Sequence, residues 1–240
     1  RGVPHRVVDL TRRFEERVVA GFVREYLDGR TPLPCARCNS ELKFVALLEA
    51  ADDVGASHVA TGHYARVEAD TANSRFTLKR GVDPEKDQSF FLFELTQAQL
   101  ARAVFPLGTW RKTEVRRYAR TRGVPVADKP ESQEICFVPD NDYAAFVARR
   151  APPADRSGII VDAGGRVLGR HDGAHHFTVG QRKGLRVSGS SPLYVLRIDA
   201  ASRTVLVGPR SALDRTSLTA SGVNWISGNP PSGPLSVAAQ

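Results

Sequence analysis

Apolar positions in the first quarter of the chain recur at the spacing of amphipathic helices. One such run covers residues 9–29 and ends at Gly29, a residue that commonly closes helices. Its apolar positions are Phe14, Val18, Phe22, Val23 and Tyr26. Asn39 is a favourable N-cap for a second helix, which Gly55 closes.

The next segments alternate between strand and helix patterns. Residues 58–61 form a short apolar run that ends at Gly62, as expected of a buried strand. Residues 64–82 alternate as in a hairpin that turns at Asn73-Ser74, and residues 96–104 and 110–122 have helical spacing. The order of helix, glycine stop, short strand and glycine is typical of an α/β domain with a parallel sheet.

The pattern changes after about residue 150. Short strands with glycine-rich turns replace the helices, for example at residues 194–198 and 204–207. Residues 151–153 read as a linker into this small β-rich part, and a further strand is expected to begin near Leu218. The sequence therefore predicts an α/β domain followed by smaller β-rich structure.

Composition narrows the class of protein. The chain has 240 residues, 41% of them hydrophobic and 25% charged, as in water-soluble globular proteins. No apolar run approaches the length that spans a bilayer, and no targeting signal is visible, so we expect a cytoplasmic protein without a membrane partner. The net charge of +8 favours a polyanionic partner, although an arginine-rich chain also results from a biased genome. Because the chain lacks methionine and stops abruptly, we expect truncation at both ends.

Three cysteines, Cys35, Cys38 and Cys136, are too few for a secreted disulfide framework. The Cys-x-x-Cys pair has three interpretations: half of a zinc site completed by a residue such as His63, two inert buried thiols, or reactive thiols. Cys38 precedes Asn39 at the predicted helix start, where the helix dipole and free N–H groups favour the thiolate. This placement suits a nucleophile.

Four further motifs have both a structural and a functional interpretation. Gly62 after a strand is an ordinary turn residue or a place where backbone approaches a ligand. Residues 86–88 read as a solvated polar turn, and Cys136 lies between apolar neighbours, as in a core strand. Residues 180–185 set two basic side chains between glycines, which suits either phosphate or an ordinary basic loop.

The order of these motifs is more informative than any one of them. The chain contains, in sequence, the blocks TPLPCARCN (31–39), ATGHYAR (60–66), KDQSFFL (86–92), FPLG (105–108), SQEICF (132–137) and GQRKGL (180–185). In this order and at like spacing the blocks resemble those of the bacterial tRNA-specific 2-thiouridylases. The resemblance extends from about Asp9 to Trp225.

The resemblance implies a fold in three parts. Residues 1–145 are similar to the C-terminal part of an ATP-pyrophosphatase-like catalytic domain, which is Rossmann-like and of the adenine nucleotide alpha hydrolase type. Residues 146–214 match a small β-rich central domain, and residues 215–240 the start of a truncated C-terminal β-barrel. It also implies a reaction: ATP with Mg²⁺ adenylates C2 of the anticodon wobble uridine, and sulfur from a cysteine persulfide displaces AMP. The chain by itself is expected to be inactive, because the family's phosphate-binding Ser-Gly-Gly-x-Asp-Ser loop lies upstream of Arg1.

The resemblance further implies residue roles. Cys38 corresponds to the nucleophile, Cys136 to the persulfide carrier and Gly62 to a backbone contact with ATP. The positions that correspond to tRNA contacts are Leu33, Pro34, Cys35, His63, Lys86, Asp87 and Gln88. The implied partners are tRNAs for Lys, Glu and Gln, and a sulfur donor that is a cysteine desulfurase or a relay protein.

The chain departs from the family pattern at two positions, and alternative mechanisms and functions remain open. Leu33 stands where many members have Asn, and Cys35 where some have Asp, so an acid–base role at this position is in doubt. Cys35, Cys38 and Cys136 are also a ligand set for an iron–sulfur cluster, which would change sulfur delivery but not the product. The competing functions are a non-catalytic tRNA-binding module with a Cys-x-x-Cys metal site and an amidotransferase-like synthetase with incidental cysteines.

Overall fold

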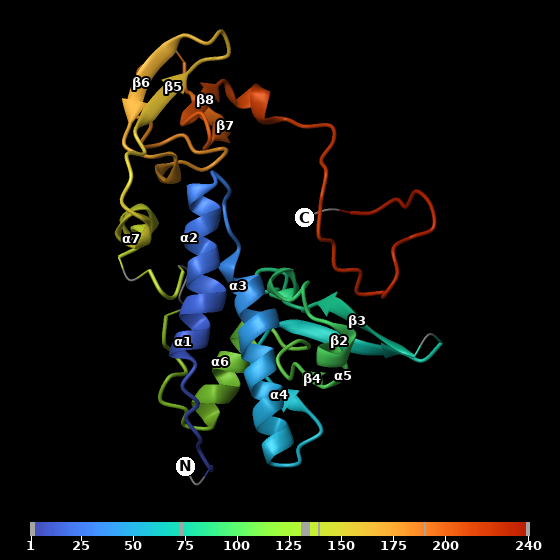
Figure 1. Ribbon diagram of the computed structural model, residues 1–240. Helices are drawn as coiled ribbons and strands as arrows, with labels where there is room; N and C mark the ends of the chain where they lie inside the picture. Colours follow the sequence, from blue (N-terminus) through green and yellow to red (C-terminus); the bar gives the residue numbers. More distant parts are fainter. Residues whose placement is uncertain (1–2, 73, 131–134, 139, 190, 239–240) are drawn as a thin grey trace. The chain divides into compact units, whose positions relative to one another are not determined.

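A computed structural model describes residues 3–72, 74–130, 135–138, 140–189 and 191–238 (Figure 1). The chain forms two compact units, each built from segments that are separate in the sequence. The first contains Arg1–Arg17, Cys35–Pro130 and Ala220–Gln240, and the second contains Val18–Pro34 and Glu131–Thr219. No helix among the described residues has both the length and the apolar character needed to cross a membrane.

The first predicted helix is confirmed. Helix α1 (Thr11–Phe14) continues through a π-helical turn (Glu15–Val19) into α2 (Ala20–Leu27). Its buried apolar residues are Val18, Val19, Phe22, Val23 and Tyr26. Gly29 ends the segment with a φ of +74°, and a Cβ on it would lie 2.8 Å from Cγ2 of Ile198, so both conformation and space require glycine.

A second continuous helical segment contains the Cys-x-x-Cys pair. It runs from α3 (Pro34–Arg37) through a π-helical turn (Cys38–Lys43) into α4 (Phe44–Asp53). Gly55 follows with a φ of +70°, as the sequence predicted.

The predicted start of this helix is wrong. Pro34 and not Asn39 begins it, because the fixed φ of proline suits the first helical position and its missing N–H is not needed there. The Asn39 side chain donates instead to the carbonyl of Phe91, at 2.9 Å. Cys38 therefore lies one turn inside the helix, and the argument that the helix start favours its thiolate does not hold; Cys35 lies nearer that end.

The core of the first unit lies beside a short parallel strand pair. Strand β1 (Val59–Ala60) pairs with β4 (Ala103–Val104), with Val59 opposite Ala103. The buried cluster around them consists of Phe44, Ala51, Val59, Ala65, Leu92, Leu95, Leu100, Ala103 and Phe105. Because the strands are parallel, Gly62 and the residues that follow β4 leave the same edge.

The predicted hairpin is confirmed. Strand β2 (Ala65–Asp70) pairs antiparallel with β3 (Arg75–Arg80). Ser74 in the turn has a φ of +51°, while Asn73 lies outside the described residues. A 3₁₀ turn at Ser89–Phe91 follows.

The two later helices of this unit are also present. Helix α5 (Gln97–Ala101) is shorter than expected, because residues 103–104 belong to β4, and Thr96 caps it by accepting from the N–H of Gln99. Helix α6 (Lys112–Thr121) ends close to Gly123, whose φ is +60°.

The second unit contains a four-stranded sheet. Its strands are β5 (Gly158–Val161), β6 (Val167–His171), β7 (Tyr194–Asp199) and β8 (Thr204–Gly208), in the order β6-β5-β8-β7. The β5–β8 pair is parallel and the other two pairs are antiparallel. A 3₁₀ turn at Ala174–His176 lies in the connection between β6 and β7. The sheet confirms the strands that the sequence predicted after residue 150.

Helix α7 (Tyr143–Arg150) was not predicted. Asp142 caps it by accepting from the N–H of Ala145, at 2.8 Å, and the ring of Phe146 lies 6.0 Å from that of Phe22 in α2. Helix α2 thus packs against the second unit, which is why residues 18–34 belong there.

The strand expected near Leu218 is absent from the described residues after the 3₁₀ turn Arg210–Leu213. The Leu218 side chain is 80% exposed and contributes little to either core. Asn224 instead donates from its side chain to the carbonyls of Phe93 and Leu95, at 2.8 and 3.1 Å. Side chain–backbone bonds take the place of a strand ladder here, and the assignment of residues 215–240 to a barrel stays a prediction.

Candidate functional site

The edge at the end of β1 is open to a ligand. Thr61 donates its N–H to the carbonyl of Val104 at 3.1 Å, which holds the two strand ends together. Gly62 follows and is exposed; a Cβ on it would meet only Cδ1 of Leu107, at the ordinary contact distance of 3.8 Å. Nothing in the described protein requires glycine here, so the absent side chain leaves space for a ligand beside the backbone.

His63 is held as a neutral ring next to this glycine. Its ring stacks on Phe44 with centroids 6.3 Å apart and meets Phe105 edge-on at 5.9 Å, while Nδ1 lies 2.8 Å from Oγ1 of Thr61. Burial, together with the charge of Lys43, lowers the pKa of His63 to about 4. At neutral pH this side chain therefore offers a hydrogen bond and no positive charge.

Polar side chains fix the helical turn that carries Cys38. Cys38 is 8% exposed, whereas Cys35 is exposed. Asn39 bonds to Phe91 as described above, Ser40 donates to Glu94 at 2.7 Å, and Gln99 donates to the carbonyl of Ser40 at 2.7 Å. The π-helical turn begins at Cys38 itself, and such turns are frequent at functional sites.

Sequence reasoning missed the positioning residues Asn39, Ser40 and Gln99. The signal that would have found Asn39 is a polar residue at a buried helical position, since buried amides are retained where they have a hydrogen-bond partner.

Cys136 lies in an exposed turn and not in a core strand, so that interpretation is wrong. The N–H of Val138 closes the turn on the carbonyl of Ile135, at 2.9 Å. The ring of Phe137 packs against Phe22 at 5.1 Å and Phe146 at 5.5 Å. Phe137 thus anchors the turn while its neighbour Cys136 faces solvent; Ser132, Gln133 and Glu134 of this motif lie outside the described residues.

Hydrogen bonds hold the Lys86-Asp87-Gln88 turn to the rest of the first unit, whereas a simple solvated turn would not need them. Asp87 accepts from the N–H groups of Gly81 and Ser89, at 3.0 and 3.1 Å. Gln88 accepts from the N–H of Tyr64 at 3.0 Å and donates its own N–H to the Tyr64 carbonyl at 2.9 Å.

The first unit brings several predicted site residues together. Gln88 joins the 86–88 turn to the residue after His63, and Phe44, from the same helical segment as Cys38, stacks on His63. Leu33 and Pro34 belong to the second unit, although Pro34 begins the helical segment in the chain. Cys136 belongs to the second unit, so its pairing with Cys38 stays a proposal.

No group of three or more His, Cys, Asp and Glu side chains among the described residues is arranged to hold a metal ion. The expectation that His63 completes a zinc site with the cysteines has no support among the described residues. An iron–sulfur cluster would require Cys136 beside Cys35 and Cys38, and it stays a prediction.

Comparisons with known proteins agree with this fold. Residues 1–140 match the family model described as a tRNA methyl transferase HUP domain, and residues 144–209 match the tRNA methyl transferase PRC-barrel domain. The chain is thus a Rossmann-like HUP domain followed by a small β domain, which confirms the predicted fold class. Relatives named tRNA-specific 2-thiouridylase MnmA are about half identical to it, and the chain belongs to the MnmA family.

Three of these relatives illustrate the similarity. The protein from Solibacter usitatus is 54% identical over 231 residues, which cover 94% of this chain and 62% of the relative. That from Geotalea uraniireducens is 54% identical over 228 residues (95% and 60%), and that from Azorhizobium caulinodans 50% over 229 residues (95% and 58%). The chain therefore spans about three fifths of the length of the curated relatives it matches.

Proposed function

We propose that the chain is part of an enzyme that converts the wobble uridine of tRNA into 2-thiouridine. The observation that carries this proposal is the 54% identity over 231 residues to a protein named tRNA-specific 2-thiouridylase. The uridine C2 oxygen attacks the α-phosphorus of ATP, and pyrophosphate leaves. The resulting adenylate makes AMP the leaving group, so that a sulfur nucleophile can add at C2.

Two cysteines complete the reaction. The outer sulfur of a persulfide on Cys136 attacks C2 and expels AMP. The Cys38 thiolate then attacks Sγ of Cys136, which breaks the S–S bond, leaves the sulfur on the uridine and forms a Cys38–Cys136 disulfide. The exposure of Cys136 supports its loading by a donor protein, and the burial of Cys38 supports its protection from that donor.

The first unit supplies the position for ATP and most positions for RNA, while Leu33 and Pro34 belong to the second unit. The open space beside Gly62 supports a close approach of ATP, with Mg²⁺ accompanying the nucleotide. His63, Leu33, Pro34, Cys35 and the 86–88 turn contact the tRNA. Asp87 and Gln88 act chiefly by holding the turn, because their side chains are bonded to the backbone.

The partners follow from the same proposal. The tRNAs are those for Lys, Glu and Gln, the donor is a cysteine desulfurase or a relay protein, and the reaction takes place in the cytoplasm. The competing tRNA-binding module with a Cys-x-x-Cys metal site is not favoured, because the described residues offer no third ligand group.

The test uses this chain grafted in place of the matching segment of the Geotalea relative, which supplies the remaining two fifths of the length. The graft is incubated with ATP, Mg²⁺, a sulfide source and unmodified tRNA, and the nucleosides are read by mass spectrometry. We expect 2-thiouridine from the graft and none from its Cys38→Ser and Cys136→Ser variants, while both variants retain tRNA binding.

Cys35→Ser is the matched control. It leaves thiolation substantial if a persulfide delivers sulfur, and it abolishes thiolation together with bound iron if a cluster does. A folded, tRNA-binding graft that makes no 2-thiouridine contradicts the proposed function.

A further inference from the structure

The loop between the second 3₁₀ turn and β7 has a fixed backbone. Gln181 accepts from the N–H of Thr178 and donates to the carbonyl of Lys183, both at 2.9 Å. The N–H of Gly180 donates to the carbonyl of Val195 at 2.8 Å, and the N–H of Val195 donates to the carbonyl of Gln181 at 2.9 Å. Leu185, only 5% exposed, anchors the far end in the core of the sheet. Residues 182–184 are therefore presented by a loop that is held on both sides.

The conformation of this loop is costly at one position. Gly180 and Gly184 have φ values of +88° and +79°, which glycine adopts readily. Arg186 has a φ of +54°, and a side chain in this left-handed region is strained. Strained backbone conformations cluster at functional sites, so the Arg186 side chain is a candidate for a functional role.

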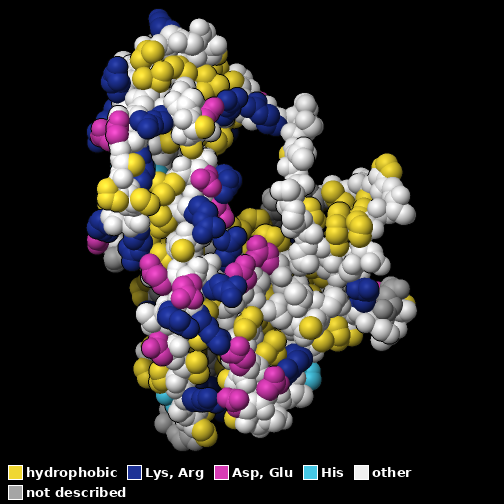
Figure 2. Space-filling model, in the orientation of Figure 1, with side chains coloured by type: hydrophobic (Ala, Val, Ile, Leu, Met, Phe, Trp, Pro, Cys, Tyr) yellow, Lys and Arg dark blue, Asp and Glu magenta, His cyan; other side chains and the backbone are white. Residues whose placement is uncertain are grey.

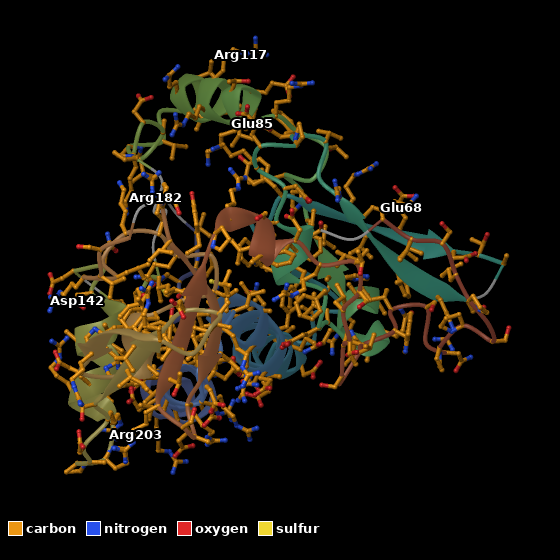
Figure 3. The ribbon with its side chains drawn as sticks, turned by 90° about the horizontal axis from the view of Figure 1, so that it is seen from above. Glu68, Glu85, Arg117, Asp142, Arg182 and Arg203 are labelled. Atoms are coloured by element: carbon orange, nitrogen blue, oxygen red, sulfur yellow. The ribbon has the colours of Figure 1, made fainter. Side chains whose placement is uncertain are left out.

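The basic side chains of this loop lack counter-charges. Arg182, Lys183 and Arg186 are exposed, and within the described part of the chain none of them forms an ion pair. Arg197 and Arg203 of the same unit are paired, with Asp199 at 3.1 Å and with Asp155 at 3.4 Å. Figure 3 labels Arg182 and Arg203 on opposite sides of this unit.

Two of these side chains, Arg182 and Arg186, line a hollow of about 510 Å³. Arg182 and Arg186 contribute its charge, Ser188 and Ser191 its hydroxyl groups, and no acidic or aromatic side chain is among its described lining residues. A smaller adjoining hollow of about 240 Å³ shares Arg186 and adds Arg170, together with one carboxylate, Asp172, and the aromatic ring of Phe177. Figure 2 shows how Lys and Arg elsewhere on the viewed face are interspersed with Asp and Glu.

We propose that the loop of Gly180–Arg186 is a binding site for the phosphates of an RNA backbone, which on the proposed function is the tRNA. Guanidinium groups on a rigid backbone match phosphate oxygens by charge-assisted hydrogen bonds. Four cations, Arg170, Arg182, Lys183 and Arg186, exceed what one small phosphate would neutralise. The absence of an aromatic ring from the described lining of the larger hollow favours backbone contact over stacking of a free nucleotide.

The test compares two double variants of this chain with equal loss of charge. Arg182→Gln with Lys183→Gln removes two of the three unpaired cations of the loop, and Arg197→Gln with Arg203→Gln removes two paired ones. Affinity for unmodified tRNA is measured by fluorescence anisotropy at several salt concentrations. We expect the loop variant to bind about tenfold more weakly at low salt and its log–log salt slope to fall by about 2, because each lost phosphate contact changes the slope by about 1. The control should keep the slope of the wild type.

A third variant separates binding from folding. Arg186→Gly relieves the strained φ, so the melting temperature is expected to stay or rise while tRNA affinity falls. A fall in melting temperature with unchanged affinity would make Arg186 structural and overturn its role in binding.

The remaining outcomes distinguish this site from the proposed function. Salt-dependent tRNA binding that is equal in the loop and control variants overturns the loop site and leaves the proposed function standing. No tRNA binding by the wild-type chain overturns the loop site, whereas the proposed function is overturned only by a folded, tRNA-binding graft that makes no 2-thiouridine. Loss of ATP binding with unchanged tRNA affinity identifies a nucleotide site and also overturns the proposal.

Discussion

At the scale of single residues, two glycines near the candidate site are glycine for different reasons. Gly62 follows β1, and a Cβ on it would meet only Cδ1 of Leu107, at the ordinary contact distance of 3.8 Å. Gly108, after β4, has none, because a Cβ there would lie 1.8 Å from the carbonyl oxygen of Ala65. Packing alone explains Gly108, whereas packing does not require glycine at position 62, which leaves room for the proposed contact with ATP.

We therefore predict opposite effects for Gly62→Ala and Gly108→Ala. Gly62→Ala should change the free energy of unfolding by less than about 0.5 kcal/mol, as at ordinary surface positions, and raise the KM for ATP in the grafted enzyme. Gly108→Ala should cost about 1–3 kcal/mol through overpacking. Urea denaturation and thiolation at varied ATP concentration measure the two quantities. An unchanged KM for ATP in Gly62→Ala would contradict a contact between this residue and the nucleotide.

At the scale of elements, side chain–backbone hydrogen bonds join segments that are distant in sequence. Asn39 and Gln99 join the cysteine helix to the segment at 91–99, and Gln97 donates to the carbonyls of both Phe76 and Ile226. These bonds replace the strand pairing that a larger sheet would supply, so each one determines how an element docks.

Asn224→Ala is predicted to release residues 220–238 from the first unit. The carbonyls of Phe93 and Leu95 lose their donor, and since the site is exposed to water the cost should be about 0.5–1 kcal/mol. Hydrogen-exchange mass spectrometry should show faster exchange in residues 220–238 and no change in the four-stranded sheet. Asn229→Ala on the same segment serves as the control; protection of 220–238 that is equal in both variants would contradict the docking role of Asn224.

At the scale of the whole molecule, each unit encloses a neutral histidine. His63 lies in the first unit and His175, 5% exposed, in the second. Burial is the main cause that lowers the pKa of each to about 4, and electrostatic interactions add to it, with Lys43 for His63 and with His176, Arg156 and His171 for His175. Acid should therefore lower the stability of both units for the same reason.

We predict that both units lose stability as the pH falls from about 6.5 to about 4. In this window the unfolded chain binds protons at His63 and His175 that the folded chain does not bind, so the free energy of unfolding decreases with decreasing pH. Calorimetric melting at a series of pH values measures the loss. His175→Gln should reduce the acid sensitivity of the second unit, whereas His58→Gln, at an exposed position, should not. Equal pH profiles for wild type and His175→Gln would contradict the assignment.

The sequence by itself determined the local elements and the family. Helical periodicity ending at Gly29 and Gly55, the alternation around Ser74 and the strands after residue 150 are signals within a few residues of one another, and local backbone preferences are enough to express them. The ordered motif blocks indicated the MnmA family, and the candidate cysteines were read directly from their positions.

Only the tertiary structure decided the environment of the site. It moved the helix start from Asn39 to Pro34, exposed Cys136 beside the anchored Phe137, and left the residues around Leu218 without a strand. Proline geometry alone accounts for the helix start, but the bond of Asn39 with Phe91 and the anchoring of Phe137 on Phe22 are contacts made far away in the chain. Burial and hydrogen-bond partners are set by such distant contacts, and no local pattern specifies them.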